Sequence, residues 1–309
     1  MISIHQLALS LGLGLAASVL LALGLLMMKQ RAAVLPIARG RSTLAAIAAW
    51  IRDPVWIAAV AVQTAGYALY IVALSKAPVS VMAVAMQGGV ALFVVLAVTL
   101  LGERARIGEW IGIGAVVLAA AMLALSLEGD SARGALDGRA LFESSIAIIA
   151  IAASLLGAPS VRETGVATAI VSGIAFGMGN LYAKALADVL AQAPDGTAVI
   201  EAMLTSRYSY LTVAGNVAGL VMLQNAFGIA RGIVAMPLAS AFSNLLQIVG
   251  GIAAFGERLP THHVDAAMRM GAFALTILSA AALAAGDIGS RAGQAIVPAA
   301  RSDSISRSA

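Results

Sequence analysis

The chain has 309 residues, of which 61% are hydrophobic and 11% are charged, and its mean hydropathy is +0.96. An ordinary soluble domain has about a quarter charged residues, so this composition excludes a soluble fold and predicts an all-α bundle of transmembrane helices. The absence of cysteine excludes disulfides and thiolate metal sites, and the Lys and Arg behind the net charge of +4 are scattered singly, which indicates topology signals rather than a nucleic-acid surface.

The first apolar run, Leu7 to Met28, carries no charge, and no Lys or Arg precedes it. It is too long and too bare at its front for a cleaved signal peptide, so we expect it to remain as a membrane helix. The next apolar stretch, Ser42 to Ile51, covers only half a bilayer and has arginines on both sides. We interpret it as an interfacial or half-spanning helix, which makes it a tenth candidate beside nine predicted spans.

Eight further runs complete the nine predicted spans. They are 55–74, 79–101, 110–127, 144–157, 166–186, 209–230, 233–255 and 266–285. The run from 144 to 157 is short and needs residues 140–143 or Ala158 to reach across a bilayer. We expect one membrane domain, residues 1–286, followed by a disordered cytoplasmic tail, residues 287–309, which is rich in Ser, Ala, Gly and Arg.

The basic residues predict the orientation of this domain in the cytoplasmic membrane. With the N-terminus outside, most of the 19 Lys and Arg, including Lys29, Arg104 and Arg231, fall on the side that also holds the C-terminus. Because cytoplasmic loops carry an excess of Lys and Arg, we expect that side to be cytoplasmic.

Two halves of the chain resemble each other. Gly102-Glu103-Arg104 closes one long apolar run and Gly256-Glu257-Arg258 closes another, and at the same offset Leu69, Met82, Ala85, Leu92 and Val95 match Leu223, Met236, Ala239, Leu246 and Val249. After a one-residue slip, Gly24 and Lys29 match Gly179 and Lys184. Four spans make repeat one, about 7–127, and four make repeat two, about 166–285. The helix at 144–157 links them, and this odd offset of five helices turns the second repeat upside down.

Inverted repeats are the usual skeleton of alternating-access transporters, in which one half rocks against the other around a central site. The alternative is that duplication only makes a stable bundle. Polar residues within the predicted spans indicate where such a site would lie, because polar side chains in a membrane usually face the bundle interior. The candidates for a substrate cavity are Gln63, Tyr67, Tyr70, Gln87, Asn180, Gln224, Asn225, Ser240, Asn244 and Gln247. The alternative for each is a helix-to-helix hydrogen bond that contributes about 1 kcal/mol or less.

No Asp or Glu lies in the middle of a predicted span. Proton coupling through an embedded carboxylate therefore has no carrier, and a magnesium path would lack the carboxylate ligands that this ion commonly takes, although amide oxygens could hold a hydrated ion. The sequence has no G-x-S-x-G and no H-E-x-x-H, so we expect no enzyme, and it implies no cofactor. It leaves any metal ligands undetermined.

Several short motifs resemble the drug/metabolite transporter superfamily (EamA-like). They are residues 73–80, Gly102-Glu103-Arg104 and Glu109-Trp110-Ile111-Gly112 in the first half, and Gln224-Asn225-Ala226 through Pro237 to residues 255–258 in the second. The nine-span count, the short element before residues 52–56 and residues 180–186 are most similar to the NIPA-type magnesium transporter branch. The resemblance covers residues 7–286. It implies an inverted-repeat fold with a central cavity, no enzymatic activity, and a substrate anywhere from amino acids and nucleotide sugars to drugs or divalent cations.

The sequence thus predicts a transporter that moves a small solute across the cytoplasmic membrane by alternating access. One alternative is a magnesium transporter of the NIPA type, and another, of a different class, is a membrane scaffold or sensor that transports nothing. The expected partners are the solute and membrane lipid, not nucleic acid. The substrate, the direction of transport, the coupling ion and the oligomeric state stay open at this point.

Overall fold

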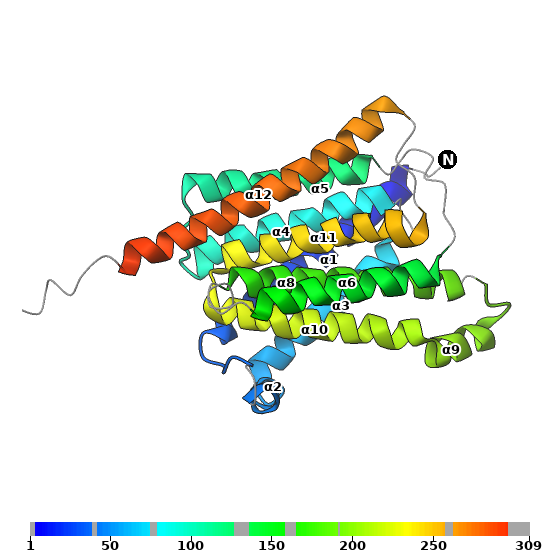
Figure 1. Cartoon of the computed structure of the whole chain (residues 1–309), viewed down its shortest axis with the longest axis horizontal. Helices are drawn as coiled ribbons and strands as arrows, with labels where there is room; N and C mark the ends of the chain where they lie inside the picture. The colour runs from blue at the N-terminus through cyan, green and yellow to red at the C-terminus, as the bar shows by residue number, and fades with distance from the viewer. Residues whose placement is uncertain are drawn as a thin grey trace, which may run out of the picture.

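The computed structural model describes residues 4–38, 42–74, 79–126, 136–157, 165–190, 192–256 and 262–295, and over these ranges it contains helices and no strands. Most of the long helices run along a common direction, and α12 crosses them at a slant (Figure 1). In chain order the elements are α1 (Ile4–Ala32), α2 (Thr43–Trp50), α3 (Pro54–Leu74), α4 (Val79–Leu100), α5 (Ile107–Leu125), α6 (Gly138–Gly157), α8 (Val166–Leu190), α9 (Gly196–Thr205), α10 (Arg207–Ile229), α11 (Gly232–Phe255) and α12 (His263–Ala295).

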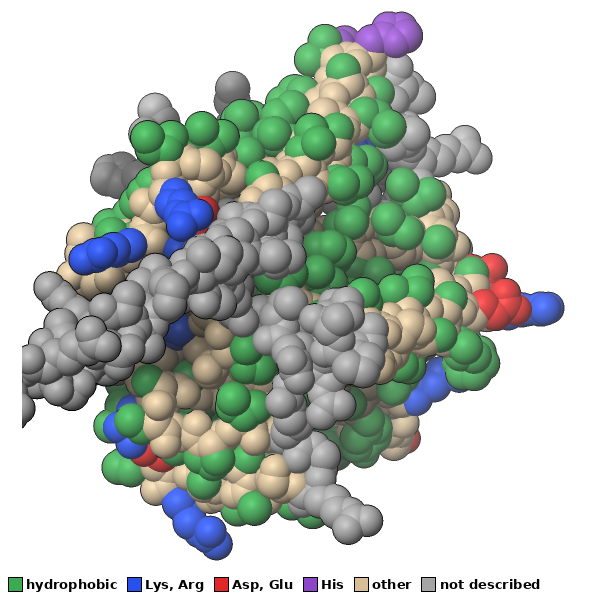
Figure 2. Space-filling view, turned by 60° about the vertical axis from the view of Figure 1, so that its left-hand side comes forward, with side chains coloured by type: hydrophobic (Ala, Val, Ile, Leu, Met, Phe, Trp, Pro, Cys, Tyr) green, Lys and Arg blue, Asp and Glu red, His purple; other side chains and the backbone are tan. Residues whose placement is uncertain are grey.

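Every predicted run coincides with one of the long helices. Within the described ranges, five of these helices are long and apolar enough to cross a membrane, or six if α2 and the first part of α3 count as one bent span. Hydrophobic side chains cover much of the face seen in Figure 2, and charged side chains lie toward its margins. The chain is therefore built as a membrane-integral protein, since lipid, and not water, is the solvent that suits such a surface.

Three segments differ from the sequence prediction. Helix α6 begins at Gly138, earlier than predicted, because Arg139 and Glu143 pair with each other one turn apart on its exposed face and do not interrupt it. Helix α9 was not predicted at all. Residues 287–295, which the sequence assigned to a disordered tail, continue α12 instead, and this stretch contains no proline to end the helix. Residues 296–309 lie outside the described residues.

The short predicted element at Ser42–Ile51 is a helix that lies across the bundle instead of along it. The axis of α2 is bent by 78° from the first part of α3. Trp50 on α2 is buried, its indole N–H donates to the carbonyl of Pro36 at 2.9 Å, and its ring lies 6.0 Å from that of Trp56. These contacts fix α2 to the end of the bundle.

The two sets of four long helices pack in the same pattern. In the first set, α1 packs on α3 and α4, and α4 packs on α5; in the second, α8 packs on α10 and α11, and α11 packs on α12. The glycines that the sequence aligned lie in equivalent contacts. A Cβ added at Gly24 would lie 3.1 Å from the backbone nitrogen of Gln63, and one added at Gly179 would lie 3.1 Å from that of Asn216. Each glycine thus permits the first helix of its set to approach the next.

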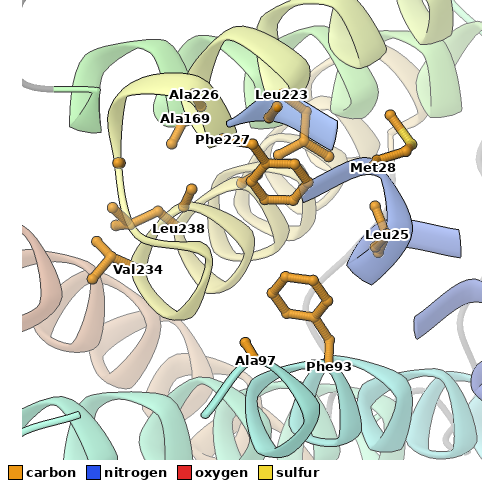
Figure 3. Packing of buried hydrophobic residues seen from close by; sticks show 14 of the residues in the cluster. Leu25, Met28, Phe93, Ala97, Ala169, Leu223, Ala226, Phe227, Val234 and Leu238 are labelled. Carbon is orange, nitrogen blue, oxygen red and sulfur yellow. The ribbon is translucent and has the colours of Figure 1, made fainter. Parts of the chain in front are cut away.

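The sets meet through α5 with α12, α4 with α11, and α1 with α10, while α6 packs on α8 and α11. Buried side chains from several of these helices form one core (Figure 3). Phe93 of α4 and Phe227 of α10 stack with ring centroids 5.8 Å apart. Because lipid is as apolar as these side chains, such contacts stabilise the bundle by close packing and not by removal from water.

Contacts between the helix ends define two ends of the bundle. The Lys29 end is the one where Lys29, Glu103 and Arg231 lie together. The Gly256 end holds the backbone bond between Asp137 and Ala254 and the stacking of Lys184 over Phe255.

The glycines of the two Gly-Glu-Arg motifs close α4 and α11 at these opposite ends. Gly102 has φ 67° and Gly256 has φ 60°, a backbone conformation that favours glycine. The shared conformation explains why a glycine stands at the same place in both motifs.

Candidate functional site

Side chains of the first half bind the corner between α10 and α11 of the second half. The ammonium of Lys29 donates to the carbonyls of Phe227 and Ala230, each at 2.8 Å. These carbonyls belong to the C-terminal end of α10, where the aligned peptide dipoles leave partial negative charge. Lys29 therefore caps a helix of the other half.

Glu103 caps the next helix in the same way. Its two carboxylate oxygens accept from the backbone N–H groups of Gly232 at 2.7 Å and Ile233 at 2.9 Å, at the start of α11. The Lys29 ammonium lies 3.5 Å from the same carboxylate. The pair thus supplies a cation to the end of one helix and an anion to the start of the next, which is the favourable sense for both helix dipoles.

Arg231, in the turn between α10 and α11, reaches back to the first half. It forms an ion pair with Glu109, whose side chain is only 2% exposed, and it donates to the carbonyl of Arg104 at 2.8 Å. Glu109 also accepts from the backbone N–H of Arg106 at 2.9 Å. A buried carboxylate without such partners would cost several kcal/mol, roughly, so Arg231 and Glu109 depend on each other.

We call Lys29, Glu103, Glu109 and Arg231 the cross-half network. Glu103, which belongs to the first Gly-Glu-Arg motif, caps α11 and not the helix that it follows. The signal available in the sequence was that Lys29, Arg104 and Arg231 fell on the same predicted side.

Among the predicted cavity residues, the neighbours Gln224 and Asn225 have opposite environments. Both are buried. The amide of Asn225 accepts from the backbone N–H of Ala38 at 2.8 Å and donates to its carbonyl at 2.9 Å, which anchors the segment between α1 and α2. Among the residues that the structure describes, neither amide atom of Gln224 has a hydrogen-bond partner. A buried amide left unpaired costs about 1–3 kcal/mol, so this side chain is not there for stability.

The other candidates lie on several helix contacts. Gln63 lies at the contact of α3 with Gly24 of α1. Asn180 on α8 and Ser240, Asn244 and Gln247 on α11 are partly buried on two helices that pack together. Gln247 donates to the carbonyl of Ser243 on its own helix at 3.1 Å. The side chain of Tyr67 is half exposed, and the side chains of Tyr70 and Gln87 lie outside the described residues.

Within the described ranges, no three His, Asp or Glu side chains gather in a way that could hold a metal ion. The chain was also compared with known proteins. No family model matches it, and neither a curated protein nor a solved structure matches it.

Proposed function

We propose that this protein is a membrane transporter of the drug/metabolite type, which moves a small solute across the cytoplasmic membrane by alternating access of two inverted halves with about nine spans. The observation that carries the proposal is the repeated packing of four helices, together with the closure of α4 and α11 by glycines at opposite ends of the bundle. Such an arrangement is what inversion of one half against the other requires. The short sequence motifs described above add the resemblance to the superfamily.

The cross-half network provides the element that alternating access needs at one end. Lys29, Glu103 and Glu109 of the first half hold the α10–α11 corner of the second half through several charge-assisted hydrogen bonds. Such bonds contribute about 1.5–3 kcal/mol each, and opening of this end would have to exchange them for other partners. We therefore assign the described arrangement to a state that is closed at the Lys29 end.

Gln224 is the side chain that we assign to the solute. Its two unpaired amide atoms, one donor group and one acceptor, lie on α10 close to the corner that the network holds. A solute with a hydroxyl, amide or carboxyl group could satisfy both, and the pairing would offset the cost of burying them. Asn225, whose amide is fully engaged with Ala38, serves as the matched control.

The first experiment separates a functional amide from a structural one. In Gln224→Met the side chain keeps its length and loses an unpaired amide, so we expect a stability equal to or higher than wild type by about 1 kcal/mol and a loss of flux. Asn225→Leu loses two hydrogen bonds of a buried backbone segment, so we expect it to unfold more easily, by about 1–3 kcal/mol. Thermal unfolding in detergent measures the stabilities.

Flux is measured in proteoliposomes with magnesium and with a panel of labelled small metabolites, each supplied alone. Flux of one organic solute that Gln224→Met abolishes supports the proposal, and magnesium flux would move the function to the NIPA type. If folded, inserted protein transports none of these probes, a scaffold or sensor becomes the better hypothesis.

The inverted orientation of the two halves is tested separately, because Arg104→Cys and His262→Cys should react with a membrane-impermeant maleimide from opposite faces. Reaction from the same face would refute the inverted repeat.

A further inference from the structure

Helix α9 is not needed to connect the helices on either side of it. Helices α8 and α10 pack directly on each other, so closely that a Cβ added at Gly215 would lie 2.8 Å from the Cα of Gly179. Two such neighbours can be joined by a loop of about two to eight residues. The chain instead uses all the residues from 191 to 206, and most of them form α9. Because α9 is not needed to join α8 to α10, its role must lie in what its surface contacts.

Both ends of α9 are fixed. Asp195 caps the first turn, accepting from the backbone N–H of Ala198 at 2.8 Å, and the hydroxyl of Thr197 donates to the same carboxylate at 2.6 Å. The hydrogen bond from Thr197, followed by that from Ala198, holds the pKa of Asp195 below its usual range. At the other end, the hydroxyl of Tyr210 donates to the carbonyl of Leu204 at 2.5 Å, which ties α9 to the first turn of α10.

The surface of α9 is divided by polarity, and none of its residues is buried. Thr197, Glu201 and Thr205 follow one another at intervals of four residues and form a polar stripe. Ile200, Met203 and Leu204 form an apolar stripe, and they are 60%, 50% and 66% exposed. Neighbouring large apolar side chains that are half or more exposed indicate a surface that contacts something else.

We propose that α9 is a membrane-surface helix, with Ile200, Met203 and Leu204 inserted in the boundary between lipid headgroups and acyl chains. With 10 residues, α9 is about 15 Å long and too short to cross a hydrocarbon core of about 30 Å. It starts and ends beside two helices that are long and apolar enough to span a membrane. It therefore lies at the level of the membrane surface, where an amphipathic helix binds with its apolar face down.

Two observations favour lipid over a protein partner. Exposed apolar side chains also lie on one face of α10, at Val213 and Val217, which are four residues apart on a helix long and apolar enough to span a membrane. Tyr210, at the junction of the two helices, is 64% exposed, and an exposed tyrosine is typical of the interfacial belt of a membrane protein. The proposal does not depend on transport.

The cysteine-free chain permits a direct test in the full-length protein. Single variants carry a nitroxide spin label, at Ile200→Cys and Met203→Cys on the apolar stripe and at Glu201→Cys and Thr205→Cys on the polar stripe as matched controls. The protein is reconstituted in phosphatidylcholine–phosphatidylglycerol vesicles. For each label, the accessibility to oxygen, which partitions into lipid, is compared with the accessibility to a water-soluble nickel chelate.

We expect the labels at 200 and 203 to be more accessible to oxygen, and those at 201 and 205 to be more accessible to the chelate. Each variant must show the helical circular dichroism and the elution volume of wild type, and because all four sites lie on the surface we expect none to unfold. If all four labels are equally open to the chelate, α9 lies in water and the proposal is wrong. If the labels at 200 and 203 are shielded from both reagents and become open on dilution of protein in lipid, the apolar stripe binds another copy of the chain, which also overturns it.

Discussion

The two ends of the bundle are held in different ways. At the Lys29 end, buried charged groups of one half bind the α10–α11 corner of the other. At the Gly256 end, the ion pair that the structure describes, Arg139 with Glu143, joins two exposed residues on a single helix. Over the described residues, the two halves thus repeat their helix packing, while the ion pairs that join one half to the other lie at the Lys29 end.

The short helices show the same contrast. Helix α2 lies at the Lys29 end and is fixed to protein by the buried side chain of Trp50. Helix α9 occupies the corresponding place in the second half and buries no residue. Duplication of the four long helices therefore does not duplicate the contacts of the short helices that connect them, α2 and α9. These contacts determine which end of the bundle is held together.

The largest effect should come from breaking one buried ion pair. Arg231→Ala leaves the buried carboxylate of Glu109 without its guanidinium partner, and we expect a loss of about 3 kcal/mol because a buried charge loses its counter-ion. Arg139→Ala, the matched change at the Gly256 end, removes an exposed pair within one helix and should cost about 0.5 kcal/mol or less. Thermal unfolding of both variants in detergent checks the difference. Equal losses would contradict the contrast between the two ends.

A smaller effect should follow from weakening the cap on α11. Glu103→Gln keeps the oxygen and removes the charge that faces the helix start, which costs about 1 kcal/mol and corresponds to roughly a fivefold change in an equilibrium. The measurement is the rate at which a water-soluble maleimide labels a cysteine at a buried position, Ala226→Cys at the Lys29 end or Ala254→Cys at the Gly256 end. We expect Glu103→Gln to raise the rate about fivefold at 226 and not to raise it at 254. A rise at both positions would indicate general loosening.

The smallest effect concerns acid pH. The guanidinium of Arg31 donates to Asp53 at 3.1 Å, and this hydrogen bond is the largest cause that holds the pKa of Asp53 below its ordinary value of 3.8. A lowered carboxyl pKa means that the contact stabilises the fold above the ordinary value and is lost as the pH falls through the lower, folded-state value. Tryptophan fluorescence should report this change, because Trp50 and Trp56 lie beside Asp53. The acid transition should disappear in Asp53→Asn, and a transition that persists there would assign it to another group.

The positions of the helices could be predicted from the sequence because apolar length alone defines a membrane helix. The aligned glycines were also predictable, since close helix contact and a positive φ both require the absence of a side chain. The ion pairs at the helix ends were less predictable from the sequence. Glu109 looked like a charge at the start of an apolar run, and its burial depends on Arg231, which is distant in the sequence and reaches it only in the folded bundle.

The candidate site shows the same limit. The sequence marked Gln224 and Asn225 alike, as amides within one predicted span, and only the structure shows that one is engaged with Ala38 and the other is unpaired. Helix α9 was missed because its 10 residues are about half the length that a membrane span needs. A search for short amphipathic stretches after an Asp-Gly pair, which can cap and start a helix, would have found it.

The length of α12 gives the molecule a rigid lever. Its 33 residues extend about 50 Å, well beyond a hydrocarbon core of about 30 Å, and Figure 1 shows its C-terminal part projecting past the other helices. Arg269, near its start, is held by the carbonyl of Ser126 at 3.1 Å. A small tilt of α12 about that point would therefore sweep its far end through a much larger arc. A pair of fluorophores, one at Ala295 and one on α2, would read any rocking of the halves as an amplified change in distance.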